Sequence, residues 1–268
     1  MASFDIDGTI LPYAHLDFSD NTIKMFELLS QKGIKSVINS AREFVTIGSL
    51  LNLVPAANYF IGANGMFVYD IKNKKIIYEN PIKLADLETI YNEVKDLPQL
   101  EGFMVTDLNF LYHSPGINKG SWFLSSHKAK MRLMDFEAID ENHIHIITLQ
   151  TYGPETTAQL ETIINKIIEK HKMPLYVNSK WHKGLFITPT GVTKYSALEW
   201  LAKKLGYEAN KNLIAFGDSS NDYEMIEHSA YGVSVGTYDE KLVALADDIA
   251  LKVEQDGAYW KLKELEII

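Results

Sequence analysis

Two aspartates near the N-terminus, Asp5 and Asp7, are separated by one residue and follow the apolar part of a short predicted strand. Residues two apart on a strand share a face, so both carboxylates should lie at the strand's carboxyl end, where parallel α/β sheets bind ligands. Two like charges held this close repel each other and favour a bound cation. The pair Asp7-Gly8 also fits the turn of an ordinary β-hairpin, and this second interpretation stays open for the segment alone.

Two further polar residues stand where predicted helices begin. Ser40 ends a buried strand, and its hydroxyl with the following free amides would receive an anion at a helix N-terminus. Serine is equally a common helix N-cap without any ligand. Lys194 opens a later helix, where a positive charge opposes the macrodipole, so it is either held by an anionic group or is a solvated surface lysine.

Residues 217–222 read Gly-Asp-Ser-Ser-Asn-Asp and follow another predicted strand. The carboxylates of Asp218 and Asp222, with the amide of Asn221, offer the oxygen ligands that magnesium prefers. The same serines and acids would also suit the first turn of an ordinary helix. All four segments lie just beyond strand ends and together supply acids, a hydroxyl, an ammonium group and metal ligands, which favours one common site.

The elements that must position these residues follow an alternating β and α pattern at both ends of the chain. The first part contains predicted strands at 3–6, 34–38 and 59–61, a hairpin of 66–69 with 75–78, and helices at 21–32 and 41–53. The last part contains predicted helices at 194–205 and 222–228 and strands at 213–216 and 232–235. This alternation predicts an α/β fold, a Rossmann-like core in which helices cover both faces of a parallel sheet.

The order of elements changes between these two parts. Helices are predicted at 84–97, 118–131 and 155–171, and strands at 102–113, 143–151, 175–181 and 185–188. Turn residues at Pro81, at Lys183-Gly184 and at Pro189 mark the change and are candidate hinges. We therefore expect a core made of residues 1–81 and 184–268 and an α+β domain inserted at 82–183.

Composition limits the function further. The chain has 268 residues, is 46% hydrophobic and 23% charged, and carries a net charge of −9. The negative charge argues against binding to nucleic acid or to an anionic membrane, and no apolar run approaches the roughly 20 residues of a membrane span. The absence of cysteine excludes disulfides, thiolate catalysis and cysteine-based zinc sites. We expect a soluble cytoplasmic protein with a small anionic substrate, and the sequence leaves the oligomeric state undetermined.

Taken in order, the four segments resemble the motifs of the haloacid dehalogenase superfamily, specifically its Cof-type phosphatases with a C2-type cap. The correspondence spans nearly the whole chain: Asp5-Ile6-Asp7-Gly8-Thr9 is similar to the DxDGT motif, Ser40-Ala41-Arg42 to Thr-Gly-Arg, Lys194 to the motif lysine, and residues 217–222 to GDxxND. Asn64-Gly65 and Asp256-Gly257 also resemble landmarks of this subgroup.

The resemblance implies that residues 1–81 and 184–268 form the catalytic core and that the inserted α+β domain at 82–183 is a cap that determines substrate specificity. It also implies a division of roles. Asp5 would be the nucleophile that forms an aspartyl-phosphate, and Asp7 would be the general acid and base. Mg²⁺ would be the cofactor, bound by Asp5, by the backbone carbonyl of Asp7 and by Asp218.

The remaining motif residues would act on the phosphate and its surroundings. Ser40, Ala41 and Lys194 would hold the phosphoryl oxygens, while Asn221 and Asp222 would support the metal site and position Lys194. Ala41 stands where the family commonly has glycine. Phe186 stands where an acidic residue is common, and the first strand is short.

The sequence therefore predicts a Mg²⁺-dependent phosphatase, a phosphoric monoester hydrolase acting on small phosphorylated metabolites such as sugar, nucleotide or cofactor phosphates. Two alternatives remain. A sugar phosphomutase of the same superfamily would use the same Asp5 and Asp7, and a non-catalytic metabolite sensor could be built on the same fold.

Overall fold

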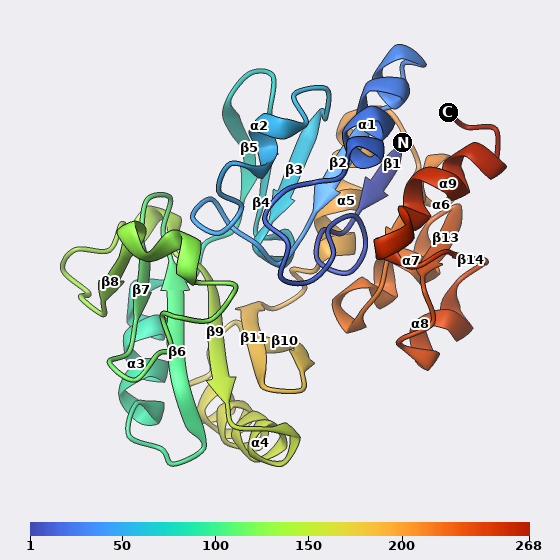
Figure 1. Ribbon diagram of the computed structural model, residues 1–268. Coiled ribbons are helices and arrows are strands. Elements are labelled where there is room, and N and C mark those ends of the chain that lie inside the picture. The colour runs from blue at the N-terminus through green and yellow to red at the C-terminus, as the bar shows by residue number, and fades with distance from the viewer. The chain divides into compact units, whose positions relative to one another are not determined.

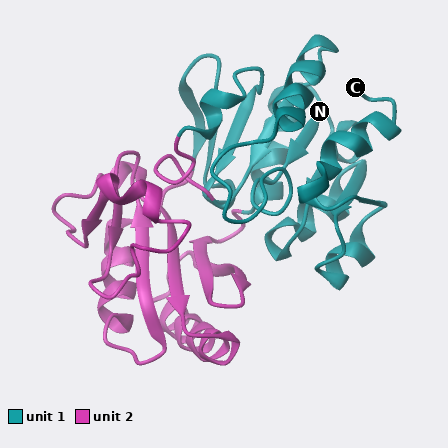
Figure 2. Ribbon diagram, in the orientation of Figure 1, with its two compact units in different colours: residues 1–41, 49–79, 193–268 teal, residues 42–48, 80–192 magenta.

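The computed structural model describes residues 1–268, and its internal contacts divide the chain into two compact units. Figure 2 shows unit 1 in teal and unit 2 in magenta. Unit 1 consists of Met1–Ala41, Ser49–Glu79 and Thr193–Ile268, and unit 2 of Arg42–Gly48 and Asn80–Val192. Each unit contains its own sheet.

Unit 1 is built on an eight-stranded sheet. Its strand order is β14 (Asp248–Ala250), β13 (Tyr231–Val235), β12 (Ile214–Gly217), β1 (Ala2–Phe4), β2 (Ser36–Asn39), β3 (Tyr59–Gly62), β4 (Phe67–Asp70) and β5 (Lys75–Glu79). The six strands from β14 to β3 are parallel, and β4 and β5 form the predicted antiparallel hairpin. β1 lies in the interior of the sheet, beside β2 (Figure 1) and paired also with β12. The carboxyl ends of three parallel strands therefore meet beside residue 5, which directly follows β1.

Helices cover both faces of this sheet. They are α1 (Asp20–Gln31), α2 (Leu50–Leu53), α5 (Lys194–Lys204), α6 (Ala209–Asn212), α7 (Tyr223–His228), α8 (Glu240–Leu245) and α9 (Gly257–Glu264), with 3-10 turns at Ala63–Gly65, Ser220–Asp222 and Val253–Gln255.

Alternation along the strands explains the two layers of core. Phe4 of β1 contacts Phe216 of β12 and Phe26 of α1, with ring centroids 5.1 and 5.5 Å apart, respectively. The neighbouring positions point to the opposite face, where Val37 and Ala215 join a buried cluster with residues of α5 and α7. The predicted Rossmann-like α/β class is therefore confirmed.

Unit 2 contains a six-stranded, mostly antiparallel sheet. Its order is β10 (Leu175–Trp181), β11 (Gly184–Pro189), β9 (His145–Thr151), β6 (Leu100–Thr106), β7 (Leu111–His113) and β8 (Met131–Leu133), accompanied by α3 (Leu84–Val94), α4 (Pro154–His171) and 3-10 turns at Ser125–Lys130 and Glu141–His143. α4 buries an apolar stripe that includes Leu160 and Ile164. No helix of the chain has the length and apolar character needed to cross a lipid bilayer.

The boundary expected at residue 184 differs from the contact division. β11 pairs antiparallel with β10 and with β9, so residues 184–189 belong to the sheet of unit 2. The turn at Lys183-Gly184 joins the two strands of a hairpin and is no hinge between the units. Unit 2 instead ends at Val192, just before α5 begins.

The helix expected at residues 41–53 is wrong except for its last turn, α2. Glu43 is buried, and its carboxylate accepts the N–H groups of Val45 and Thr46 at 2.9 and 3.0 Å. The Arg42 guanidinium donates to the Thr46 carbonyl at 2.8 Å. These side chains satisfy backbone groups locally, and Gly48 adopts a positive φ of 56°, so the chain forms turns and not a helix here.

The helix expected at residues 118–131 is also wrong. The Asn118 side chain accepts the N–H of Gly120 at 2.9 Å, and the Ser121 hydroxyl accepts the N–H of Leu124 at 3.3 Å. These short-range bonds compete with helical ones. Only Ser125–Lys130 forms a 3-10 turn, and Met131 begins β8.

Candidate active site

Asp5 directly follows β1, and its N–H donates to the Phe216 carbonyl of β12 at 3.0 Å. The residue is 5% exposed, and its Oδ1 accepts a bond from Lys194 Nζ at 2.6 Å. Burial raises the pKa of Asp5 well above its ordinary value, because the opposing effect of Lys194 is smaller. An ionised Asp5 therefore requires further positive charge nearby. β1 pairs in parallel on both sides, so the hairpin interpretation of this segment is wrong.

Lys194 opens α5 and is buried, so it is not a surface lysine. Its ammonium group donates to Asp222 Oδ1 at 2.8 Å as well as to Asp5. Burial alone would lower the pKa of Lys194, but the carboxylates of Asp222 and Asp5 raise it above its ordinary value. Lys194 is therefore a fixed positive charge. A capping box of Thr193 and Ser196 starts the helix, with bonds of 3.0 and 2.8 Å.

The turn after β3 fixes the start of α5. A Cβ on Gly65, whose φ is +100°, would lie 2.6 Å from the Thr193 carbonyl carbon and 3.2 Å from the Lys194 nitrogen. Glycine thus permits the close approach of two backbones. The preceding Asn64 accepts from the side chain of Asn221 at 3.0 Å, and its N–H donates to the Ser40 carbonyl at 3.1 Å. This one turn connects three of the predicted motifs.

Asp222 organises the loop after β12. Its Oδ2 accepts the N–H groups of Asp218 and Ser219 at 3.1 and 3.2 Å, while Oδ1 receives Lys194. Gly217 fits tightly against it, since a Cβ there would lie 2.5 Å from Asp222 Cβ. Both oxygens of Asp222 are therefore engaged within the protein, and its carboxylate serves best as a buried partner of Lys194.

Asp218 receives a hydroxyl on each oxygen. Thr9 donates to Oδ1 at 3.0 Å and Tyr13 donates to Oδ2 at 3.1 Å. Burial, followed by the charge of Asp222, raises the pKa of Asp218 to about 7. Burial and the charge of Asp218 also raise the pKa of the Tyr13 phenol, so it stays protonated and acts as a donor. Sequence reasoning missed Tyr13, because it lies beyond the motif and no spacing rule connects it to Asp218.

Gly8 makes the contact between these groups possible. Its φ is +88°, and a Cβ would lie 2.6 Å from Asp218 Cγ and 2.9 Å from the Tyr13 hydroxyl. Both the backbone conformation and the lack of space require glycine.

The other predicted residues lie at the same carboxyl edge of the sheet of unit 1. Ser40 follows β2, is buried, and donates its N–H to the Ile61 carbonyl at 2.9 Å. No helix begins at Ser40, so the expected helix N-terminus and its N-cap are absent. Ser40 can offer an anion its hydroxyl at the end of β2, but no helix N-terminus. Asp7 and Ala41 are half-buried, and Asp7 forms an isolated bridge with Leu11.

The charges and donors of this site fit a divalent cation. Asp5, Asp218 and Asp222 offer carboxylate oxygens within 4.8 Å of one another. The single ammonium of Lys194 offsets one of their three charges, which leaves two buried negative charges. Oxygen donors with a net charge of this sign suit magnesium. Asp5 and Asp218 are the better ligands. Asp222 already accepts three bonds, one of them from the Lys194 ammonium, whereas each oxygen of Asp218 accepts a single neutral hydroxyl.

A pocket of about 410 Å³ lies beside Asp218 in unit 1. Its lining comprises Gly8, Tyr13, Asp218, Ser219, Tyr238, Asp239, Val253 and Glu254.

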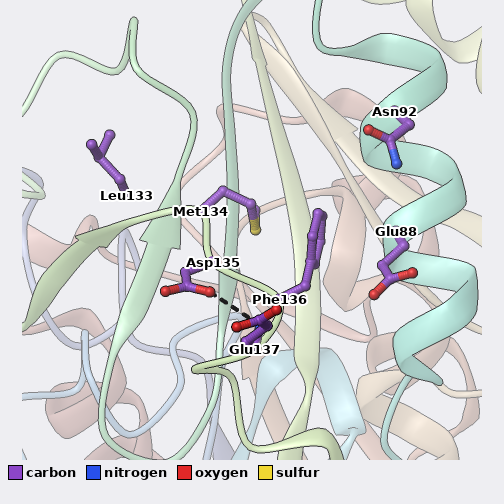
Figure 3. Close-up of a pocket in the computed structure, with 7 residues that line it drawn as sticks. All are labelled: Glu88, Asn92, Leu133, Met134, Asp135, Phe136 and Glu137. Atoms are coloured by element: carbon purple, nitrogen blue, oxygen red, sulfur yellow. Dashed lines mark hydrogen bonds between the residues drawn. The ribbon is translucent and has the colours of Figure 1, made fainter.

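A second pocket, of about 640 Å³, lies in unit 2 between α3 and the segment after β8 (Figure 3). It is lined by Glu88, Asn92, Leu133, Met134, Asp135, Phe136 and Glu137. Three of these residues are carboxylates and none is a lysine or arginine, so the pocket repels a phosphate ester. It contains none of the residues predicted from the sequence.

Comparison with known proteins agrees with this geometry. Residues 2–262 match the family model described as haloacid dehalogenase-like hydrolase. The chain is 24% identical to YkrA of Bacillus subtilis (strain 168), covering 99% of this chain and 97% of YkrA. It is 23% identical to the pyridoxal phosphate phosphatase YbhA of Escherichia coli (strain K12), covering 91% and 90%.

A solved structure shares the fold over the full length. BT4131, a sugar phosphatase of HAD subclass IIB, superposes with a TM-score of 0.81 at 20% identity and covers 100% of this chain and 99% of its own. The resemblance to Cof-type phosphatases inferred from the four motifs is thereby confirmed.

Proposed function

Because the chain belongs to the haloacid dehalogenase-like hydrolases and is a phosphoric monoester hydrolase of that family, we propose that it is a Mg²⁺-dependent phosphatase of small phosphorylated metabolites with Asp5 as nucleophile. The observation that carries this proposal is the position of Asp5 at the end of the central strand, 2.6 Å from the buried ammonium of Lys194. Phosphoryl transfer mainly requires alignment and neutralisation of charge, and this arrangement offers both.

The proposed reaction has two steps. An Asp5 carboxylate oxygen forms a bond to phosphorus while the ester P–O bond breaks, and Asp7 gives a proton to the departing alkoxide. In the second step, Asp7 takes a proton from water, whose oxygen attacks phosphorus, and the bond to Asp5 breaks to release phosphate. The half-buried position of Asp7 beside the buried Asp5 suits a group that exchanges protons with water and leaving group.

Other residues would hold the phosphoryl group. Lys194 offers a fixed positive charge, and Ser40 and Ala41 lie at the end of the neighbouring strand. Asp5, Asp218 and the Asp7 carbonyl would hold Mg²⁺, which when bound neutralises charge on the nucleophile and the phosphate. Asp222 and Asn221 would keep Lys194 and the loop in place through the bonds described above.

The substrate class is proposed from relatives. YbhA acts on pyridoxal phosphate and BT4131 on a sugar phosphate, so we expect a sugar, nucleotide or cofactor phosphate. We assign the choice among these metabolites to the inserted unit, as expected for residues 82–183, because the residues of unit 1 described above are directed at the phosphate and the cation.

The test is hydrolysis of an aryl phosphate and of a panel of phosphorylated metabolites, with and without Mg²⁺. Asp5→Asn should lower turnover by at least ~10³-fold, roughly 4 kcal/mol of barrier. The exposed Asp17→Asn, in the same N-terminal segment, is the matched control and should hydrolyse normally.

Each other outcome has a defined meaning. Turnover that is indifferent to Asp5 would refute the mechanism. An isomeric sugar phosphate in place of free phosphate would identify a mutase, and tight binding without turnover of any ester would identify a sensor.

A further inference from the structure

The loop after β1 folds back on itself. The Gly8 N–H donates to the Leu11 carbonyl at 2.9 Å, and the His15 N–H donates to the Pro12 carbonyl at 3.1 Å. Pro12 restricts its own φ angle within this turn. The loop thereby holds Tyr13 in place beside the site, although the residue lies eight positions after Asp5 in the sequence.

Tyr13 reaches a residue that is far away in sequence. Its hydroxyl donates to Asp218 Oδ2 at 3.1 Å, across 205 positions of the chain. Asp218 is 6% exposed, whereas Tyr13 is 56% exposed, so an exposed residue here donates to a buried carboxylate. Thr9, which is buried, holds the other oxygen.

We propose that Tyr13 is a positioning residue for the divalent cation, acting through Asp218 without touching the cation itself. The inference deepens the proposed function and rests on it, because Asp218 must be a ligand of the cation. The motifs of the family do not include this position.

The physical reason is the freedom of a carboxylate. The final torsion of an aspartate is broad, so one hydrogen bond leaves the plane of the group free to rotate. Hydroxyls on both oxygens of Asp218 fix this plane before a cation arrives. Hydrogen-bonded groups behind a metal ligand typically contribute about 10–100-fold to metal affinity.

Tyr13→Phe removes the hydroxyl and keeps the ring. Since the side chain is more than half exposed, no core packing is lost. Tyr238→Phe is the matched control, because Tyr238 lines the same pocket and is 61% exposed, while the hydroxyls on Asp218 come from Thr9 and Tyr13.

The first measurement is Mn²⁺ binding to the full chain without substrate, with free Mn²⁺ followed by electron paramagnetic resonance. Tyr13→Phe should weaken binding about 10–100-fold. Tyr238→Phe should stay within twofold of wild type. Unchanged or tighter binding in Tyr13→Phe would overturn the proposal, as would a wild type that binds no Mn²⁺.

The second measurement separates the two proposals. The substrate is an ester that the wild type hydrolyses. Tyr13→Phe should raise the Mg²⁺ concentration that gives the half-maximal rate by the same factor by which it weakens Mn²⁺ binding. Its kcat at saturating Mg²⁺ should stay within about threefold of wild type. A fall in kcat with unchanged cation dependence would refute positioning. If no ester is hydrolysed but wild type binds Mn²⁺ and Tyr13→Phe weakens it, the proposed function fails and the role of Tyr13 stands.

Discussion

Replacing Lys194 by methionine should destabilise unit 1 strongly. The ammonium is fully buried, and its partners Asp5 and Asp222 are 6% and 0% exposed at their side chains. Methionine preserves much of the length but leaves these carboxylates without their buried counter-charge. Removing one partner of a buried ion pair costs about 3–5 kcal/mol, which for a domain of 150–250 residues corresponds to a Tm lower by roughly 6–20 °C.

The assay is thermal unfolding without divalent cations, combined with hydrogen exchange of peptides from β1 and β12. These two strands flank the site, so their exchange reports on unit 1 specifically. Lys203→Met is the matched control. Lys203 is 68% exposed on the same helix and pairs with Glu199, and such a surface pair contributes only about 0–1 kcal/mol.

A second substitution tests the electrostatic reason. If the loss comes from uncompensated negative charge, adding Asp222→Asn to Lys194→Met should recover part of the stability, because one of the repelling carboxylates disappears. A Tm within about 2 °C of wild type for Lys194→Met, or a double variant less stable than the single one, would refute this reasoning.

Two further changes test the surrounding structure. Gly8→Ala should lower the free energy of unfolding by at least about 1–3 kcal/mol and abolish tight Mn²⁺ binding, because φ is positive and the methyl group would collide with Asp218. Unfolding measures the first effect and Mn²⁺ titration the second. An alanine variant with wild-type Mn²⁺ affinity would contradict the predicted collision. His127 lies beside Gly48, and burial, followed by the charges of Arg42 and Lys130, lowers its pKa. Because the unfolded chain then binds the proton more readily, stability falls as the pH drops through about 6.5. The protection factors of residues 42–48, which are hydrogen-exchange rates corrected for the intrinsic rate at each pH, should therefore fall between pH 7 and 5.5 in wild type but not in His127→Gln.

The edge of the sheet that carries the proposed site was predictable from the sequence, because its geometry depends on where the strands end. Asp5 and Lys194 are 189 positions apart, yet Asp5 follows β1 and Lys194 opens α5, a helix that packs against the same sheet. Parallel strands bring their carboxyl ends to one edge, so polar residues after separate strands meet there. That rule places Asp5, Ser40 and Asp218 without any knowledge of side-chain contacts.

Contacts that depend on the backbone conformation of a loop were not predictable from the sequence. Tyr13 reaches Asp218 only because the chain turns back after Gly8, and no periodicity in residues 8–15 reveals that turn. The helix expected at 41–53 failed for a related reason. The apolar spacing there is helical, but the Glu43 carboxylate takes the backbone N–H groups that a helix would have used.

Residues 42–48 show that unit 2 is not one continuous insertion in the sequence. Val45 is fully buried in a cluster with Met104, Leu111, Ile117, Leu124 and Met131, all from the inserted part of the chain. Yet Arg42–Gly48 lies in sequence directly after Ser40 and Ala41, between the first two stretches of unit 1. Deleting residues 80–192 would therefore expose Val45 and remove the packing that holds the segment next to the proposed phosphate ligands. Only three residues separate Val45 from Ala41, so the core of the inserted unit and the proposed phosphate ligands share one short stretch of backbone.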